Sequence, residues 1–259
     1  MAWLLIDNSN TRTKFALGDH LQLHPWRGVL PTSEVSYETL AQLLHRVVFD
    51  AVMVCSVVPL KAAVLQDYFK NKENCHFLDS TSPIGMAIDY PNPTQIGADR
   101  LANAAAVLTR HGVPAIIIDF GTAVTFDVIS AAPAYCGGVI APGLGAMSDY
   151  LSRKAALLPQ IELLEPPSAI GKSTIHAMQV GAVIGYRGLV KEIISQISAE
   201  LSGSPKIIAT GGDAALIAKG VPAIQCVDPD ITLDGLRQVA ARLFFGKIGQ
   251  KTCHPPQIH

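Results

Sequence analysis

The sequence predicts an α/β protein built from two duplicated halves with a cleft between them, and three observations support this prediction. Residues 3–11 (WLLIDNSNT) and 116–125 (IIIDFGTAVT) share one pattern, an apolar run that ends in aspartate before small or polar residues. Each copy continues into a second strand-like run, at residues 14–17 and 126–129. Strand and helix patterns then alternate after each copy, as in a mixed α/β fold.

The two copies are predicted to be β-hairpins, because turn-forming residues separate two apolar runs in each. One copy alone is a weak signal, since a strand that ends in aspartate before a turn is common. The pair is stronger, because Asp7 is followed by Thr11 and Asp119 by Thr122. Small residues let backbone N–H groups approach phosphate, and carboxylates hold the cation that neutralises it. The pattern therefore favours phosphoryl transfer without a Walker loop.

The rest of the first half predicts a strand at 51–55 and a helix after Pro59 that carries Leu60, Val64 and Tyr68 near one face. A loop rich in proline and asparagine, residues 89–95, leads to residues 97–100 (GADR). An alanine-rich helix is expected at 101–111, where Gly112 and Pro114 end it.

The second half predicts a strand at 136–141, a long helix at 174–201, a strand at 206–210 before a Gly-Gly-Asp turn, and a closing helix at 233–245. Gly181, Gly185 and Gly188 lie on or near one face of the long helix, which indicates close backbone packing within the chain or between subunits. Ser173 is a plausible N-cap of this helix. The expected domains are 1–113 and 114–259, with the closing helix a candidate to pack back on the first.

Composition excludes several classes of protein. The chain has 259 residues, 49% hydrophobic and 16% charged, and a formal net charge of −1, which favours a compact globule over a nucleic-acid or membrane-surface binder. Asp7 interrupts the first apolar run, so no signal peptide is expected, and no window reaches the ~20 apolar residues of a membrane span. Five scattered cysteines match neither a disulfide framework nor a metal site, so we expect a cytoplasmic protein.

The two hairpins, residues 97–100, residues 174–181 (TIHAMQVG) and residues 209–212 (ATGG) together resemble the type III pantothenate kinases, in family order from Leu5 to about Asp213. The resemblance implies two actin-like (ribonuclease H-like) domains of the acetate and sugar kinase, Hsp70 and actin superfamily, with ATP in the cleft. It also implies a homodimer that phosphorylates pantothenate to 4'-phosphopantothenate with ATP, the first step of coenzyme A biosynthesis. Potassium or ammonium would be required, and ATP chemistry implies Mg²⁺.

The resemblance also implies roles for individual residues. Asp99 matches the catalytic base, Asp119 the ligand of the monovalent cation and Thr122 an ATP contact, and Asp7 is our candidate to hold Mg²⁺ through water. The phosphate-binding hairpin would comprise Asp7, Asn8, Ser9, Asn10, Thr11, Arg12, Thr13 and Lys14. The pantothenate site would comprise Tyr90, Gly97, Ala98, Asp99, Arg100 and Thr174, the last supplied by the partner subunit.

Some of these residues have a purely structural alternative. Asp99 would also suit the first turn of a helix, where an acid is favourable, but this leaves Arg100 badly placed for the helix dipole. The planar guanidinium of Arg100 suits a carboxylate, which pantothenate carries. Tyr90, beside Pro91, is as compatible with packing as with function. Asp127 follows the second hairpin and would either assist a metal or face solvent.

The first hairpin departs from the family pattern Asp-x-Gly-Asn-Thr, because Ser9 stands in the glycine position. Serine would either keep the turn and add a hydroxyl donor or crowd ATP, and we expect weakened ATP binding. The alternatives are a non-catalytic regulatory or accessory protein on the same fold and a kinase for another small hydroxyl substrate. Retention of Asp7, Asp99, Asp119 and Thr122 argues against the regulatory alternative.

Overall fold

The computed structural model describes residues 1–245, which form two compact units. Unit 1 comprises Met1–Met86, Pro91–Val107 and the residues from Asp230 on, and unit 2 comprises Ala87–Tyr90 and Leu108–Pro229. The ranges expected from the sequence, 1–113 and 114–259, differ from these units at residues 87–90 and 108–113, which belong to unit 2, and the last helix belongs to unit 1, as the alternative for that helix allowed. The last helix packs on the sheet of unit 1, and Ala87 and Ile88 pair with a strand of unit 2.

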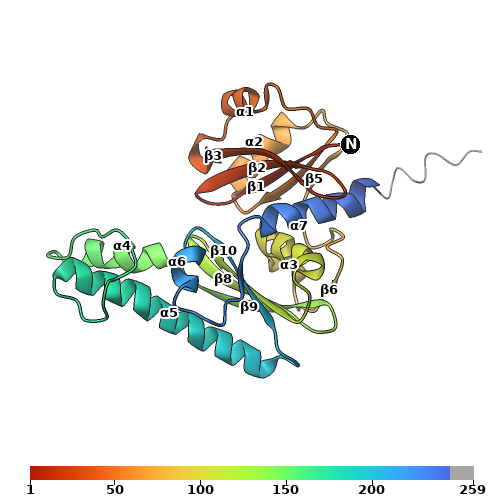
Figure 1. The fold of residues 1–259 in the computed structure, drawn as a ribbon. Helices are drawn as coiled ribbons and strands as arrows, with labels where there is room; N and C mark the ends of the chain where they lie inside the picture. Colours follow the sequence, from red (N-terminus) through yellow and green to blue (C-terminus); the bar gives the residue numbers. More distant parts are fainter. Residues whose placement is uncertain (246–259) are drawn as a thin grey trace, which may run out of the picture. The chain divides into compact units, whose positions relative to one another are not determined.

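Unit 1 is built on a five-stranded sheet in the order β3-β2-β1-β4-β5 (Figure 1). Its strands are β1 (Trp3–Asn8), β2 (Arg12–Gly18), β3 (Leu23–Pro31), β4 (Ala51–Ser56) and β5 (Cys75–Phe77). β1 pairs antiparallel with β2 and parallel with β4, and this register sets Asp7 opposite Lys14. The first predicted hairpin is therefore confirmed.

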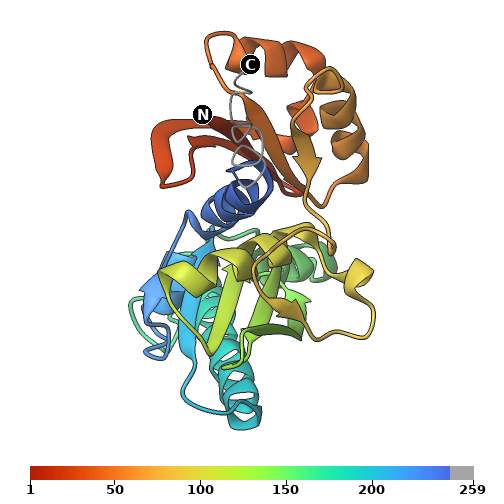
Figure 2. The same cartoon turned by 90° about the vertical axis from the view of Figure 1, so that its right-hand side faces the viewer.

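Helices cover both faces of this sheet, since alternate residues of β1 point to opposite sides. Leu4 and Ile6 belong to the core beneath α1 (Tyr37–Leu44) and α2 (Pro59–Tyr68), and β1 also contacts α7 (Ile231–Ala240) (Figure 2). A π-helical turn, Ala241–Phe245, follows α7. The predicted apolar face of α2 is wrong at Leu60, which is 83% exposed, because the helix instead buries Leu65.

Unit 2 repeats this topology in the order β11-β10-β7-β8-β9, with β6 added outside β9. Its strands are β6 (Ala87–Ile88), β7 (Ala115–Phe120), β8 (Ala123–Ile129), β9 (Ala134–Pro142), β10 (Lys206–Gly211) and β11 (Cys226–Val227). β7, β8 and β9 form an antiparallel meander like that of β1, β2 and β3, and β10 runs parallel to β7 as β4 does to β1. The predicted α/β duplication is confirmed.

The helices of unit 2 are α4 (Leu144–Lys154), α5 (Thr174–Glu200) and α6 (Ala214–Ala218), and α3 (Ala98–Arg110) begins in unit 1. The short helices η1 (Thr32–Glu34) and η2 (Pro93–Gln95) precede α1 and α3. Ser173 caps α5 as predicted, since its Oγ accepts a hydrogen bond from the His176 backbone N–H at 3.2 Å. Within residues 1–245 no helix combines the length and apolar character that crossing a membrane requires.

Candidate active site

The tip of the first hairpin is braced from inside by buried polar side chains. Asn8 and Thr13 are fully buried, and Asn8 Nδ2 donates to Thr13 Oγ1 at 2.7 Å. Ser56 Oγ donates to Asn8 Oδ1 at 2.7 Å, and Thr32 Oγ1 donates to the carbonyl of Ser9 at 2.7 Å. These bonds satisfy side chains that would otherwise be costly to bury. The exposed side chains at the tip are those of Asn10, Thr11 and Arg12.

Asp7 lies at the end of β1 with its side chain buried. Ser9 Oγ donates to Asp7 Oδ1 at 2.7 Å, and Lys14 Nζ lies 3.7 Å from Asp7 Oδ2. Burial raises the pKa of Asp7, and the charge of Lys14 and the hydrogen bond from Ser9 counteract part of that rise. The serine in the glycine position thus contacts the carboxylate of Asp7.

Asp99 lies in the first turn of α3, which begins earlier than the predicted start at residue 101. Its Oδ1 accepts a hydrogen bond from the Arg100 backbone N–H at 2.8 Å. A Cβ on Gly97 would lie 2.5 Å from the same oxygen, so glycine at this position leaves room for the carboxylate. Burial raises the pKa of Asp99, the charge of Asp7 raises it further, and the hydrogen bond and charge of Arg100 oppose the rise. Within unit 1 the structure therefore brings Asp99 into the electrostatic field of Asp7.

Glycines surround the tip of the second hairpin. Asp119 is partly buried at the end of β7, and a Cβ on Gly211 would lie 2.6 Å from Asp119 Oδ1 and 2.5 Å from the Phe120 carbonyl oxygen. Gly211 has a φ of +93°, which other residues rarely adopt. A Cβ on Gly143 would lie 2.5 Å from the carbonyl oxygen of Thr122, whose side chain is exposed.

The second tip offers oxygen donors, the kind of ligand that a monovalent cation takes. Within residues 1–245 no three histidine, cysteine, aspartate or glutamate residues are grouped to hold a metal ion. Potassium is commonly held by oxygens, including backbone carbonyls, and Asp119 Oδ1 and the Phe120 carbonyl oxygen both lie close to Gly211. Mg²⁺ bound beside phosphate oxygens usually takes one or two carboxylate contacts from the protein, and Asp7 is one carboxylate at the first tip.

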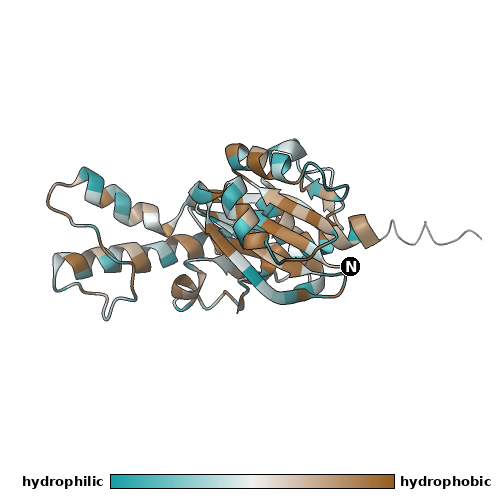
Figure 3. Ribbon diagram, turned by 90° about the horizontal axis from the view of Figure 1, so that it is seen from above, coloured by the Kyte–Doolittle hydropathy of each residue, from teal (hydrophilic) through white to brown (hydrophobic). Residues whose placement is uncertain are grey.

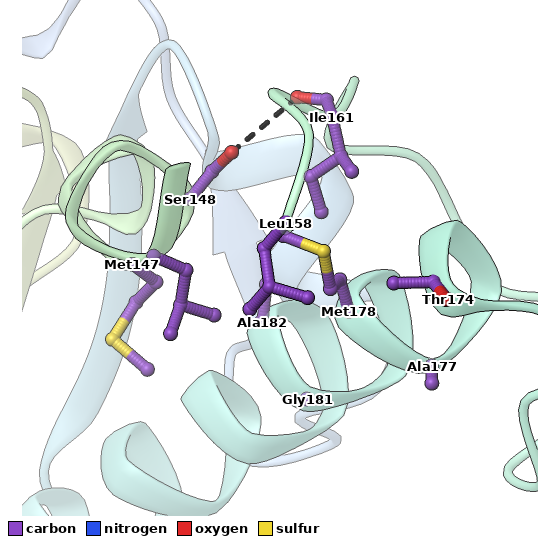
Figure 4. A pocket seen from close by; sticks show the side chains of 10 residues that line it. Met147, Ser148, Leu158, Ile161, Thr174, Ala177, Met178, Gly181 and Ala182 are labelled. Atoms are coloured by element: carbon purple, nitrogen blue, oxygen red, sulfur yellow. Dashed lines mark hydrogen bonds between the residues drawn. The ribbon is translucent and has the colours of Figure 1, made fainter. Parts of the chain in front are cut away.

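The remaining predicted substrate residues lie in unit 2. Tyr90 follows β6, and its ring meets that of Tyr135 with a centroid distance of 6.4 Å. Thr174 is exposed at the start of α5 and borders an apolar cavity of about 510 Å³ between α4 and α5, where Met147, Leu158 and Met178 converge (Figure 4).

Asp127 does not face solvent, which corrects one of its two predicted alternatives. It is fully buried, and its Oδ1 accepts a hydrogen bond from the Tyr135 hydroxyl at 2.9 Å. The sequence of β8 did not predict this burial, because an aspartate at this position of a strand usually marks a solvated face.

The structure thus groups the predicted residues within each unit. In unit 1 the hairpin Asp7–Lys14 accompanies Gly97, Ala98, Asp99 and Arg100, and in unit 2 lie Tyr90, Asp119, Thr122 and Thr174. Sequence reasoning missed the bracing residues Thr32 and Ser56 and the close approach of Gly143 to the second hairpin. Isolated hydroxyl and glycine residues gave no signal of these contacts, which join positions far apart in the chain.

Comparison with known proteins is consistent with this geometry. Residues 3–196 match the family model described as type III pantothenate kinase. The chain is 57% identical over 240 residues to a type III pantothenate kinase of Akkermansia muciniphila, covering 93% of this chain and 98% of that protein. It is 41% identical over 238 residues to a type III pantothenate kinase of Methylacidiphilum infernorum, covering 91% of this chain and 87% of that protein.

Solved structures show the same fold at low sequence identity. The activator of 2-hydroxyisocaproyl-CoA dehydratase from Clostridium difficile, with bound ADPNP, has a TM-score of 0.54 and 13% identity over 100% of both chains. A Campylobacter jejuni protein assigned to the Baf family of transcriptional activators has a TM-score of 0.61 and 21% identity, covering 93% of this chain and 98% of that one. The predicted actin-like fold is confirmed.

Proposed function

This chain belongs to the type III pantothenate kinase family, and we propose that Asp99 accepts the proton of the pantothenate hydroxyl as ATP phosphorylates it. The observation that supports this role is a buried carboxylate with a raised pKa, given room by Gly97 at the start of α3. A base is most effective when its pKa lies near the working pH, so burial makes this aspartate better suited to accept a proton than an exposed one.

Little more than orientation and late proton removal is required of Asp99. In phosphoryl transfer the transition state is loose, so the protein mainly positions the reactants and stabilises charge. The bond from the Arg100 backbone N–H fixes Asp99 Oδ1, which leaves Asp99 Oδ2 to meet the primary hydroxyl of pantothenate. The hydroxyl oxygen then bonds to the γ-phosphorus, the bond to the β-phosphate oxygen breaks, and the proton passes to Asp99.

The substrate and nucleotide contacts follow the family pattern residue by residue. The guanidinium of Arg100 would pair with the pantothenate carboxylate, and Gly97, Ala98, Tyr90 and the partner subunit's Thr174 would complete that site. Thr122 and the tip Ser9–Arg12 would contact ATP, with Lys14 beside Asp7 adding positive charge. Asn8 and Thr13 would act indirectly, because the hydrogen bond between their side chains stabilises the turn.

Two cations complete the proposed site. Asp7 would hold Mg²⁺ through water, and Asp119 would hold potassium or ammonium beside the Phe120 carbonyl. These cations neutralise phosphate charge when bound. The proposed location of the enzyme is the cytoplasm, where ATP is available.

We also propose that the enzyme is a homodimer through α5. Gly181, Gly185 and Gly188 are exposed, and a Cβ on any of them would meet no atom of this chain within 4 Å outside the helix backbone. Ile184 and Leu189 are 39% and 36% exposed, and Figure 3 shows hydrophobic segments along α4 and α5. A partner backbone can approach such a face closely.

Sedimentation tests the proposed dimer. It should give a dimer at micromolar concentration for wild type and a monomer for Gly185→Arg, with Leu60→Arg as the exposed control. A wild-type monomer would refute the dimer.

The decisive assay measures ADP release from ATP and Mg²⁺, with and without pantothenate, in potassium and then in sodium buffer. We expect release that depends on pantothenate and is faster in potassium. Release that ignores pantothenate would point to another hydroxyl substrate, and no release from folded protein would favour the regulatory alternative.

Asp99→Asn tests the assigned base. Asparagine keeps the oxygen that accepts the Arg100 N–H but cannot take a proton, so turnover should fall by about 100-fold or more. The melting temperature should not fall, because a buried charge is removed. The exposed change Glu73→Gln is the control, and near-normal turnover of Asp99→Asn would remove Asp99 from the mechanism.

A further inference from the structure

A buried carboxylate–phenol pair lies in the sheet of unit 2. Asp127 on β8 and Tyr135 on β9 are both fully buried, and the Tyr135 hydroxyl donates to Asp127 Oδ1 at 2.9 Å. A buried carboxylate is costly unless hydrogen bonds compensate it, and an apolar residue would fill this sheet position more cheaply. The bond fixes the outer end of the Tyr135 side chain, while β9 fixes the other end.

The ring held in this way supports Tyr90. The rings of Tyr90 and Tyr135 meet edge to face, with centroids 6.4 Å apart and an interplanar angle of 66°. The backbone N–H of Asp89 donates to the Tyr135 carbonyl at 2.9 Å, so the same residue holds the chain next to Tyr90. Edge-to-face aromatic pairs have a preferred geometry, which limits the orientations open to Tyr90.

Gly137 also lies next to the Tyr90 ring. Its φ is +110°, and a Cβ there would lie 3.3 Å from Tyr90 Cε2. Any side chain would be strained in this backbone conformation and would press on the ring. Glycine therefore lets the Tyr90 ring lie directly against β9.

We propose that Asp127, Tyr135 and Gly137 are positioning residues of the pantothenate site, which set the orientation of Tyr90. The proposal rests on the proposed placement of Tyr90 against pantothenate. These three residues act through Tyr90 and do not themselves contact the substrate. A bond that served only the stability of the sheet would leave pantothenate affinity unchanged when removed.

The first test is Tyr135→Phe in the full-length protein, which keeps the ring and removes the hydroxyl. The Kd for pantothenate, measured by titration calorimetry, and the KM for pantothenate should each rise about fivefold, with the KM for ATP unchanged. Tyr186→Phe is the matched control, because it also removes a hydroxyl hydrogen bond from a buried tyrosine of unit 2, 2.9 Å from the Pro142 carbonyl. It should leave the affinity for pantothenate unchanged.

A double-mutant cycle separates positioning from stability. In a Tyr90→Ala background, Tyr135→Phe should change the Kd for pantothenate no further, because the residue it positions is gone. An equal change in both backgrounds, or none in the wild type, would overturn the proposal. Gly137→Ala provides a second variant and should weaken pantothenate binding more than Tyr135→Phe. If wild type binds pantothenate and these variants match it, this inference alone fails; if wild type binds none, the proposed function fails with it.

Discussion

The first hairpin holds its tip with hydrogen-bonded side chains, whereas the second packs its tip against glycines. Below the first tip Asn8, Thr13 and Ser56 form a buried network, and Ser9 and Lys14 contact the two oxygens of Asp7. Around the second tip, Gly211 and Gly143 lie against Asp119 and Thr122 so closely that a Cβ on either glycine would clash. One strand–Asp–turn pattern therefore produces two environments for its aspartate.

The difference is electrostatic as well as steric. Asp7 is almost fully buried and has a raised pKa, and it raises the pKa of Asp99 in the same unit. Asp119 is more accessible and adjoins a backbone carbonyl. Under the proposed mechanism, the buried acid beside a second acid would control charge near the reacting hydroxyl, and the more accessible acid beside a carbonyl would hold a monovalent cation.

Among the hairpin variants the largest expected effect comes from Asp7→Asn, which removes the carboxylate of the first hairpin. Turnover should fall by about 100-fold, because the proposed contact to Mg²⁺ and phosphate charge is lost. The fold should remain, since asparagine keeps an acceptor for Ser9 Oγ. Steady-state kinetics and a thermal melt measure both, and a fall below tenfold would contradict the role given to Asp7.

The same variant should shift the pH profile. The negative charge of Asp7 raises the pKa of Asp99, so its removal lowers that pKa. The base must be deprotonated, so residual kcat/KM should persist to lower pH in Asp7→Asn than in wild type. Glu73→Gln should leave the acid limb of the profile in place, and a limb that does not move in Asp7→Asn would show that the two carboxylates do not interact.

Gly211→Ala should have the next largest effect, because it breaks the glycine packing of the second hairpin. The methyl group would meet the Phe120 carbonyl at 2.5 Å in a backbone conformation with φ of +93°. We expect a loss of about 1–3 kcal/mol in the free energy of unfolding. Gly212→Ala is the control, since a Cβ there meets no atom within 4 Å. Urea denaturation of both variants measures the difference, and equal stabilities would refute the steric account.

Asp119→Asn should have a smaller effect than Gly211→Ala. It should change only the response of the activity to the monovalent cation. Activity in potassium should fall at least about tenfold, towards its level in sodium, because the charged cation ligand is gone. Asp7→Asn should keep the ratio of activities in potassium and sodium. A potassium response that survives in Asp119→Asn would place the cation elsewhere.

Local sequence patterns predicted both hairpins and the long helix. Many of the remaining features depend on contacts between residues that lie far apart in the chain. The apolar runs before Asp7 and Asp119 predicted both hairpins, because a fully buried strand needs continuous hydrophobicity. Exposed residues of β3 alternate with partly buried or buried ones from Pro25 to Pro31, but the prolines and the glycine of this strand, like the glycine start of α4, gave no comparable apolar signal. α3 begins at Ala98, before residue 101, because the Gly97 carbonyl accepts hydrogen bonds from the Arg100 and Leu101 backbone N–H groups, a local contact that the alanine-rich pattern alone did not indicate.

The same limit applies to the site. The resemblance selected Asp99, Tyr90 and Asp119 as candidates, but the depth at which each lies depends on its neighbours in space. Asp127 illustrates this, because its burial follows from Tyr135 across the sheet and from no feature of β8 alone. Burial and hydrogen bonding, which decide a pKa, are properties of the packed units.

Ser9→Gly should produce the smallest effect and tests what replaces glycine in the first hairpin. Within residues 1–245 no residue other than glycine has a positive φ, so Ser9 adopts this turn without the backbone conformation that would require glycine. Its hydroxyl instead contacts Asp7 Oδ1. Removing that bond frees an oxygen of Asp7 for the proposed cation, so the KM for ATP should fall by about threefold. Ser9→Ala separates two causes: a matching fall would assign the effect to the hydroxyl, and an unchanged KM would assign it to crowding by Cβ. Identical KM values for wild type and Ser9→Gly would show that Ser9 is irrelevant to ATP binding.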